Sequence, residues 1–134
     1  MAVDQSRLKP FGFFEGLGQD DLSFIGVNCS EVKVSSGTVF IWQGQVGKEI
    51  YLLENGSVKV FRGDPDRPKD LAVLEGPTIV GELVLLDPAR IRTSSVVALS
   101  DLQLLSIPVR TFLAITGAYP SVKAKVREVM AARR

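Results

Sequence analysis

The stretch "VGELVLLDPARIRTSSVVA", residues 80–98, places a single carboxylate, Glu82, inside an apolar run. Arg92 follows ten residues later, directly before a second run that is almost free of charge. A charge that is buried without a partner costs several kcal/mol or more, so apolar segments exclude it unless it is paired or binds something. We therefore expect Glu82 and Arg92 to be partners of each other or of a bound ligand.

The glycine before this carboxylate predicts the local backbone. Gly81 stands where an apolar strand gives way to a short helical turn that begins with Glu82, Leu83 and Val84. Exposed backbone N–H groups at such a start, together with the helix dipole, favour an anion. A glycine also lets a ligand approach the backbone closely. The turn is therefore a candidate anion site.

Arg92 follows a proline-containing turn, and we expect it to begin a strand over residues 92–99. If the turn returns Arg92 over the helix start, its planar guanidinium can bind a phosphate through two parallel hydrogen bonds. Glu82 is an acceptor that suits sugar hydroxyls, while Thr93 and Ser94 add hydroxyl donors. The set fits a small ligand with one phosphate and a ribose, and the same spacing also fits a purely structural salt bridge between the two charges.

The composition fits one globular domain. With 134 residues and a hydrophobic content of 46%, the chain can build a single sizeable core, and we expect one domain over residues 1–134. Sixteen basic residues against fifteen acidic ones leave a net charge of +1, which argues against a general electrostatic grip on nucleic acid or on an anionic membrane. Any recognition is therefore expected to be local.

The chain has no histidine and one cysteine, Cys29. This excludes zinc sites of the His/Cys type, histidine-ligated haem, Ser-His-Asp and Cys-His catalysis and an intramolecular disulfide. Cys29 follows a short apolar stretch, which favours a buried structural thiol over a reactive one. We expect no metal cofactor and, because no nucleophile–base pair is evident, no enzymatic activity.

The amino terminus "MAVDQSRLKP" lacks the apolar core of a secretory signal. No apolar segment approaches the roughly 20 residues that a membrane-spanning helix needs. We expect a soluble, cytoplasmic protein that makes no contact with a membrane.

Three zones of different period follow one another along the chain. Residues 1–27 predict short helices, because apolar residues follow helix-start residues at spacings of three to five. Residues 28–107 show short apolar bursts and a turn every eight to twelve positions, typical of an all-β barrel or sandwich, with 62–70 as a hairpin tip. Residues 108–134 predict two helices, and the basic residues of the second form a solvated face or contact a phosphate. The apolar stripe of that second helix is Val122, Val126, Val129 and Met130.

Residues 80–96 resemble the phosphate-binding cassette of the cyclic nucleotide-binding domain family, which includes catabolite activator proteins, regulatory subunits of protein kinase A and cyclic-nucleotide-gated channels. The family pattern is Phe-Gly-Glu-Leu-Ala-Leu, a short variable turn, and then Arg-(Ala/Ser/Thr)-Ala-(Ser/Thr)-Val. The resemblance extends over roughly residues 10–132. It implies a mainly β fold, a double-stranded β-helix (jelly-roll) barrel with short amino-terminal helices and two carboxy-terminal helices. The matching residues are Gly81, Glu82, Leu83, Leu85, Leu86, Arg92, Thr93, Ser94, Ser95 and Val96.

The resemblance also implies a role for the residues of the cassette. Glu82 would accept the ribose 2′-hydroxyl, and Arg92 would pair with the cyclic phosphate. Backbone amides of Leu83 and of Thr93 or Ser94 would complete the phosphate cradle. The ligand-binding residues implied in this way are Gly81, Glu82, Leu83, Arg92, Thr93 and Ser94, with Val60 and Leu71 as apolar lining.

Recognition of the base is less constrained by the resemblance. The last helix of the family supplies a lid over the base, and Arg133 is the residue of this chain that reaches in by analogy. Thr93 resembles cassettes that accept cGMP, since a hydroxyl there can meet the guanine amino group, but the same threonine occurs in members that prefer cAMP. The choice between the two nucleotides therefore stays open.

The expected function is that of a regulatory binding module for cAMP or cGMP, which signals occupancy through its carboxy-terminal helices to a protein partner or output domain. The alternative is a degenerate cyclic nucleotide-binding fold that acts as a ligand-free structural or interaction domain. A homodimer through the last helix is a further expectation. The sequence stops before a helix-turn-helix could begin, so we expect no direct DNA binding from this chain.

Overall fold

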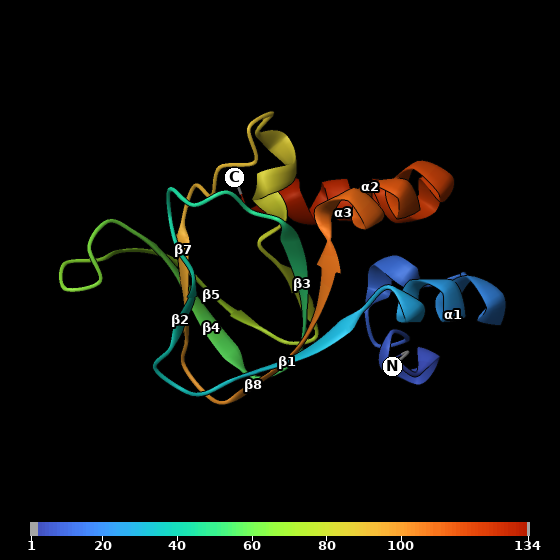
Figure 1. The fold of residues 1–134 in the computed structure, drawn as a ribbon, viewed down its shortest axis with the longest axis horizontal. Coiled ribbons are helices and arrows are strands. Elements are labelled where there is room, and N and C mark those ends of the chain that lie inside the picture. The colour runs from blue at the N-terminus through green and yellow to red at the C-terminus, as the bar shows by residue number, and fades with distance from the viewer. Residues whose placement is uncertain (1–2, 134) are drawn as a thin grey trace.

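The computed structural model describes residues 3–133 (Figure 1). Within these residues, two 3₁₀ turns, η1 (Gln5–Arg7) and η2 (Gly12–Phe14), and one helix, α1 (Gln19–Val27), precede the strands. Acidic residues stand in the first turn of α1, where they complement the helix dipole. The short amino-terminal helices predicted from the sequence are confirmed.

Eight strands of the described chain form two antiparallel sheets of four strands each (Figure 1). The first sheet has the order β1-β8-β3-β6 and the second the order β2-β7-β4-β5. Most neighbours are distant in sequence, so the chain crosses repeatedly between the sheets, as in a jelly roll. The predicted jelly roll is confirmed, and its two sheets are not joined into one closed hydrogen-bonded barrel within residues 3–133. The strands are β1 (Ser30–Val34), β2 (Val39–Ile41), β3 (Glu49–Asn55), β4 (Ser57–Arg62), β5 (Lys69–Glu75), β6 (Thr78–Val80), β7 (Ser95–Ala98) and β8 (Leu102–Pro108).

Two apolar clusters hold the sheets and helices together. One contains strand residues such as Leu53, Val58 and Leu104, drawn from both sheets. The other joins the first sheet to the helical segments and includes Phe11 and Phe112. Strand β8 contributes to both clusters, because its successive residues Leu104 and Leu105 point to opposite sides and are both buried.

The turn between β3 and β4 requires glycine. Gly56 has a φ of 109°, and a Cβ added there would lie 2.6 Å from the Leu102 Cδ2 atom and 2.7 Å from the Asp101 carbonyl oxygen. On the other side of β4, Arg62 pairs with Lys69 at the tip of the β4–β5 hairpin, which extends away from the sheets (Figure 1). The hairpin predicted for residues 62–70 is confirmed.

Two helices follow the sheets, as predicted. They are α2 (Val109–Ala118) and α3 (Pro120–Ala132). The predicted stripe of α3 faces the core, with Val122, Val126 and Met130 buried. Within residues 3–133, no helix combines the length and the apolar character that crossing a bilayer requires.

The strand predicted over residues 92–99 starts later than expected, since β7 begins at Ser95. The backbone N–H of Arg92 donates to the Gln45 carbonyl at 2.8 Å, and the Arg92 carbonyl accepts from the Gly44 N–H at 2.9 Å. Because its peptide groups pair with this loop, Arg92 lies outside the sheet.

Cys29 is buried, as predicted, with 3% of its surface exposed. Its thiol donates to the Ile25 carbonyl oxygen at 3.3 Å. Burial raises the pKa of the Cys29 thiol from 9.0 to about 12. The thiol therefore stays protonated at neutral pH, which makes it a poor nucleophile.

Candidate functional site

A cavity of about 470 Å³ lies against the turn η3 (Glu82–Leu86). This volume falls within the range of about 300–1,000 Å³ that is typical of small-molecule sites. All eight residues predicted to bind a ligand line the cavity, although their role in binding stays a prediction. The lining residues are Ile41, Val60, Arg62, Leu71, Ala72, Leu74, Val80, Gly81, Glu82, Leu83, Val84, Arg92, Thr93, Ser94, Val96, Ala132 and Arg133.

Gly81 turns the chain from β6 into η3, as predicted. Its backbone adopts the left-handed region, with φ 81° and ψ 13°, which favours glycine. A Cβ at this position would lie 2.7 Å from the Arg92 Nη1 atom. Gly81 therefore serves both the turn and the close approach of the arginine.

The guanidinium of Arg92 is held by backbone carbonyls. Its Nη1 donates to the Gly81 carbonyl at 3.0 Å and its Nη2 to the Glu49 carbonyl at 2.7 Å. Gly47 makes room for it, since a Cβ there would lie 2.6 Å from the Arg92 Nε atom. A guanidinium carries five N–H donors, so those not used by the backbone remain for a ligand in the cavity.

Arg92 is buried, with 8% of its surface exposed. Burial lowers the pKa of Arg92, while nearby Tyr51, Glu49 and Glu82 act in the opposite direction. Arginine remains protonated in proteins despite such shifts. The cavity thus contains a permanent, fixed and largely desolvated cation, which is well suited to a phosphate.

The expected pairing of Glu82 with Arg92 is wrong. Glu82 is 3% exposed, and its Oε1 atom accepts a hydrogen bond from the Arg133 Nη1 atom at 2.7 Å. No ion pair joins Glu82 to Arg92 in the part of the chain that the structure describes. The turn does bring Arg92 near η3, but its two terminal nitrogens donate to backbone carbonyls. The basic partner of Glu82 is instead Arg133, directly after α3.

Three successive hydroxyls follow Arg92 and have different surroundings. Thr93 is exposed at the cavity, and its carbonyl accepts a hydrogen bond from the Arg62 Nε atom at 3.2 Å. The Ser95 Oγ atom accepts from the Gln43 N–H at 2.9 Å and so has a structural role. The Ser94 Oγ atom is buried and has no hydrogen-bond partner among residues 3–133. Ser94 therefore contributes an unsatisfied hydroxyl to the wall of the cavity.

The apolar wall of the cavity comes from the second sheet. Val60 of β4 pairs with Ala72 of β5 and Val96 of β7, and all three line the cavity together with Leu71. The sequence did not predict that Ala72 and the charged Arg62 line the cavity. The alternation of β4 and β5 could have indicated this face, but the register of the two strands shifts between Val60 and Phe61, which no sequence pattern showed.

Within residues 3–133, no three side chains of the His, Cys, Asp or Glu type come together in a way that could hold a metal ion. The polar groups of the cavity are arginines, hydroxyls, backbone amides and one carboxylate, which suit an anionic organic ligand with hydroxyl groups.

Residues 31–119 match the family described as "Cyclic nucleotide-binding domain". The match covers more than half of the 134 residues and includes the strands and the cassette that form the cavity. This chain belongs to the cyclic nucleotide-binding domain family.

Individual relatives agree with this assignment. The cyclic AMP receptor protein of Thermus thermophilus is 29% identical over 129 residues, covering 94% of this chain and 58% of that protein. Human cyclic nucleotide-gated channel beta-3 is 36% identical over 120 residues, covering 88% of this chain and 15% of the channel. This chain therefore corresponds to only part of the length of each of these relatives.

A solved structure supports the fold. The sensor domain of the transcriptional regulator DNR from Pseudomonas aeruginosa superposes with a TM-score of 0.81 at 20% identity, covering 96% of this chain and 87% of that one. The short helices, the two sheets and the two carboxy-terminal helices thus occur together in a known sensor domain.

Proposed function

We propose that residues 1–134 form a single cyclic nucleotide-binding domain that acts as a regulatory binding module for cAMP or cGMP. The observation that carries this proposal is the meeting of Glu82, Arg92 and the unpartnered Ser94 hydroxyl at one cavity, in a chain that belongs to this family. The module holds a phosphodiester and does not cleave it, because the lining residues among 3–133 supply hydrogen-bond donors and a cation but no nucleophile–base pair.

In this proposal the cyclic phosphate lies against the free N–H groups of Arg92 and the backbone amides of Leu83 and of Thr93 or Ser94. The ribose 2′-hydroxyl donates to Glu82. The base then faces the apolar wall of β4 and β5. Each part of the nucleotide thereby meets a group of matching chemistry, since the buried cation takes the anion and the carboxylate takes the hydroxyl.

Signalling through the carboxy-terminal helices belongs to the same proposal. Arg133, directly after α3, contacts Glu82, so a ligand on Glu82 acts on the end of this helix. The helix then reports occupancy to a protein partner, to an output domain or to a second copy of the chain. The cytoplasmic location and the lack of direct DNA binding stay predictions.

A second candidate function is that of a ligand-free structural or interaction domain. One observation favours it, namely that both charges are already satisfied within the chain. Glu82 pairs with Arg133, and both terminal nitrogens of Arg92 donate to backbone carbonyls. The unpartnered Ser94 hydroxyl argues in the other direction, because a purely structural cavity would gain by satisfying it or removing it.

Calorimetric titration with cAMP and with cGMP separates the two candidates. We expect saturable one-to-one binding of at least one nucleotide to the wild-type chain, and recovery of that nucleotide intact after incubation. Arg92→Lys should weaken binding at least tenfold, because lysine cannot reproduce the planar fork. Arg127→Gln is the matched control, since this arginine is exposed on α3 and does not line the cavity. Absence of binding at millimolar nucleotide would favour the structural candidate.

A further inference from the structure

Arg133 is fixed at the corner where β6 leads into η3. Its Nη1 atom donates to the Glu82 Oε1 atom at 2.7 Å and to the Ile79 carbonyl at 2.6 Å. Its Nη2 atom donates to the Thr78 Oγ1 atom at 2.6 Å. These three partners belong to one short stretch of chain, and the Arg133 side chain is 15% exposed. The Arg133 guanidinium therefore joins the three residues of this corner through hydrogen bonds, and one of these contacts is also an ion pair.

The contact leaves half of the Glu82 carboxylate available. Arg133 takes the Oε1 atom, and no described residue donates a hydrogen bond to Oε2. Among the side-chain nitrogens and oxygens of residues 3–133, the Ser94 Oγ atom is the only one that is both fully enclosed and without a partner. Oε2 also has no partner among these residues, so it is not fully enclosed. A ligand hydroxyl can therefore reach Oε2 while Arg133 keeps its place on Oε1.

The cavity has its full volume with Arg133 in position. The side chain and its neighbour Ala132 form part of the wall around about 470 Å³. The end of α3 also lies beside η3 in Figure 1. Binding of a small ligand thus does not require displacement of the arginine.

We propose that Arg133 is a positioning residue, which holds the Glu82 carboxylate so that Oε2 accepts the ribose 2′-hydroxyl of the nucleotide. This inference rests on the proposed function and deepens it. Three donor contacts fix the guanidinium, and the guanidinium in turn fixes one carboxylate oxygen, which orients the other. The ion pair also offsets part of the cost of burying the Glu82 carboxylate, which is 3% exposed. The chain directly after α3 thereby becomes part of the nucleotide site.

The test compares nucleotides with and without the group that Glu82 accepts. For Arg133→Gln we expect the affinity for the cyclic nucleotide that the wild type binds to fall on the order of tenfold, as for a lost hydrogen bond to a charged group. For the 2′-deoxy analogue of the same nucleotide we expect no difference between variant and wild type. The loss of affinity should be absent for the analogue because Arg133 acts only through Glu82, and the 2′-deoxy analogue has no 2′-hydroxyl for Glu82 to bind.

Three further variants sharpen the comparison. Thr78→Val removes one contact of Arg133 without altering a residue that lines the cavity, so it should cause a smaller loss that is also confined to the 2′-hydroxyl ligand. Arg133→Lys keeps the charge and should retain more affinity than the glutamine variant. Arg127→Gln removes the same charge from an exposed position of α3 and should leave both affinities unchanged.

Each alternative role of Arg133 gives a different result. An increase in affinity on Arg133→Gln would mean that arginine and nucleotide compete for Glu82, and would overturn the proposal. An equal loss for the ribose and 2′-deoxy ligands would mean that Arg133 contacts another part of the ligand or only supports the fold, with the same consequence. An unchanged affinity overturns this inference alone, whereas a wild-type chain that binds neither cAMP nor cGMP overturns the proposed function as well.

Discussion

Ser94 has a buried hydroxyl that no group of residues 3–133 satisfies. A buried hydroxyl without a partner costs about 1–3 kcal/mol. Its persistence at the wall of the cavity is understandable if a ligand completes it.

Ser94→Ala should therefore separate folding from binding. The free variant is expected to be as stable as the wild type or more stable, because the unsatisfied hydroxyl is removed. Nucleotide affinity should fall about two- to tenfold, the value of one ordinary hydrogen bond. Thermal unfolding and calorimetric titration measure the two effects.

Ser95→Ala is the matched control for this variant. The Ser95 Oγ atom accepts a hydrogen bond from the Gln43 N–H, so its removal should lower the stability of the free chain by about 1 kcal/mol. A Ser94→Ala variant that loses stability in the same way, with unchanged affinity, would show that Ser94 is structural.

The contacts of Glu82 and Arg92 were only partly predictable from the sequence. The motif predicted that Glu82 and Arg92 would lie close to η3, and both line the same cavity. It could not predict that the partner of Glu82 is Arg133, because 51 residues separate the two and no local pattern connects them. The short spacing between Glu82 and Arg92 suggested an ion pair. The structure has none within residues 3–133, because backbone carbonyls accept the hydrogen bonds of the Arg92 terminal nitrogens.

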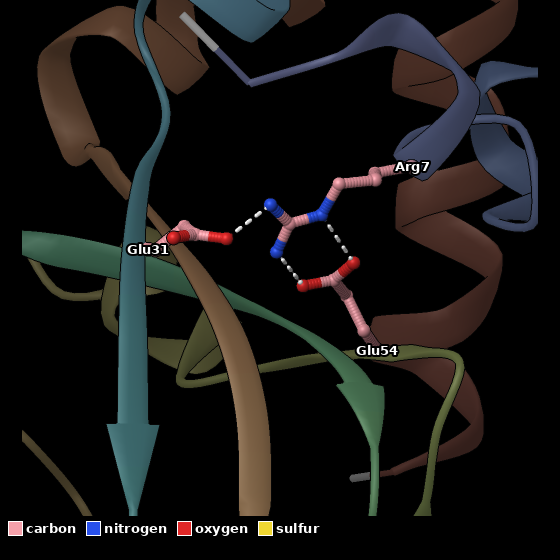
Figure 2. Close-up of polar contacts among 3 residues, drawn as sticks. All are labelled: Arg7, Glu31 and Glu54. Atoms are coloured by element: carbon pink, nitrogen blue, oxygen red, sulfur yellow. Dashed lines mark hydrogen bonds and ion pairs between the residues drawn. The ribbon is translucent and has the colours of Figure 1, made fainter. Parts of the chain in front are cut away.

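At the level of elements, Arg7 connects the amino-terminal turn η1 to the first sheet (Figure 2). Its Nε and Nη2 atoms donate to the two carboxylate oxygens of Glu54 at 2.9 and 2.6 Å, and its Nη1 atom donates to Glu31. The bond to Glu54 is the first cause that raises the pKa of Arg7. Two strands, β1 and β3, are thus tied to one side chain of the amino-terminal segment.

A double-mutant cycle should find unequal coupling in this cluster. We expect about 1–2 kcal/mol between Arg7 and Glu54, because the contact is bidentate and the Glu54 side chain is only 15% exposed. Coupling between Arg7 and Glu31 should stay below about 1 kcal/mol, since the Glu31 side chain is 59% exposed. Urea unfolding of the Arg7→Gln, Glu54→Gln and Glu31→Gln variants and their pairs measures both, and equal couplings would contradict the structural difference.

The elements themselves were largely predictable. Glycine turns between apolar bursts indicated the short strands, and the spacing of Val122, Val126 and Met130 indicated α3. The start of β7 was not predictable, because Arg92 lies outside the strand only through backbone pairing with a loop that is distant in sequence. Local propensity does not contain such information.

At the scale of the whole molecule, the two-sheet fold brings residues that are far apart in the sequence together around the cavity. Strands β4 and β5 form one wall of the cavity, and η3 with the segment after it forms the floor. The residues around Arg133 form the rim. Filling the cavity therefore links the second sheet to the carboxy-terminal helices, and we expect binding to stabilise the chain as one unit.

Such stabilisation has a defined magnitude. A ligand that binds only the folded chain should add about 2.7 kcal/mol to the free energy of unfolding at 100 times its dissociation constant, and about 4.1 kcal/mol at 1,000 times. With about 2.1 cal/mol/K of unfolding entropy per residue, the first value corresponds to a rise in melting temperature of roughly 10 °C for 134 residues. Thermal unfolding at increasing cAMP or cGMP measures this rise, and Arg92→Lys should show a much smaller shift at the same nucleotide concentration. A melting temperature that does not continue to rise over that tenfold increase in nucleotide, or that rises equally in the variant, would mean that the nucleotide does not act through the Arg92 cavity.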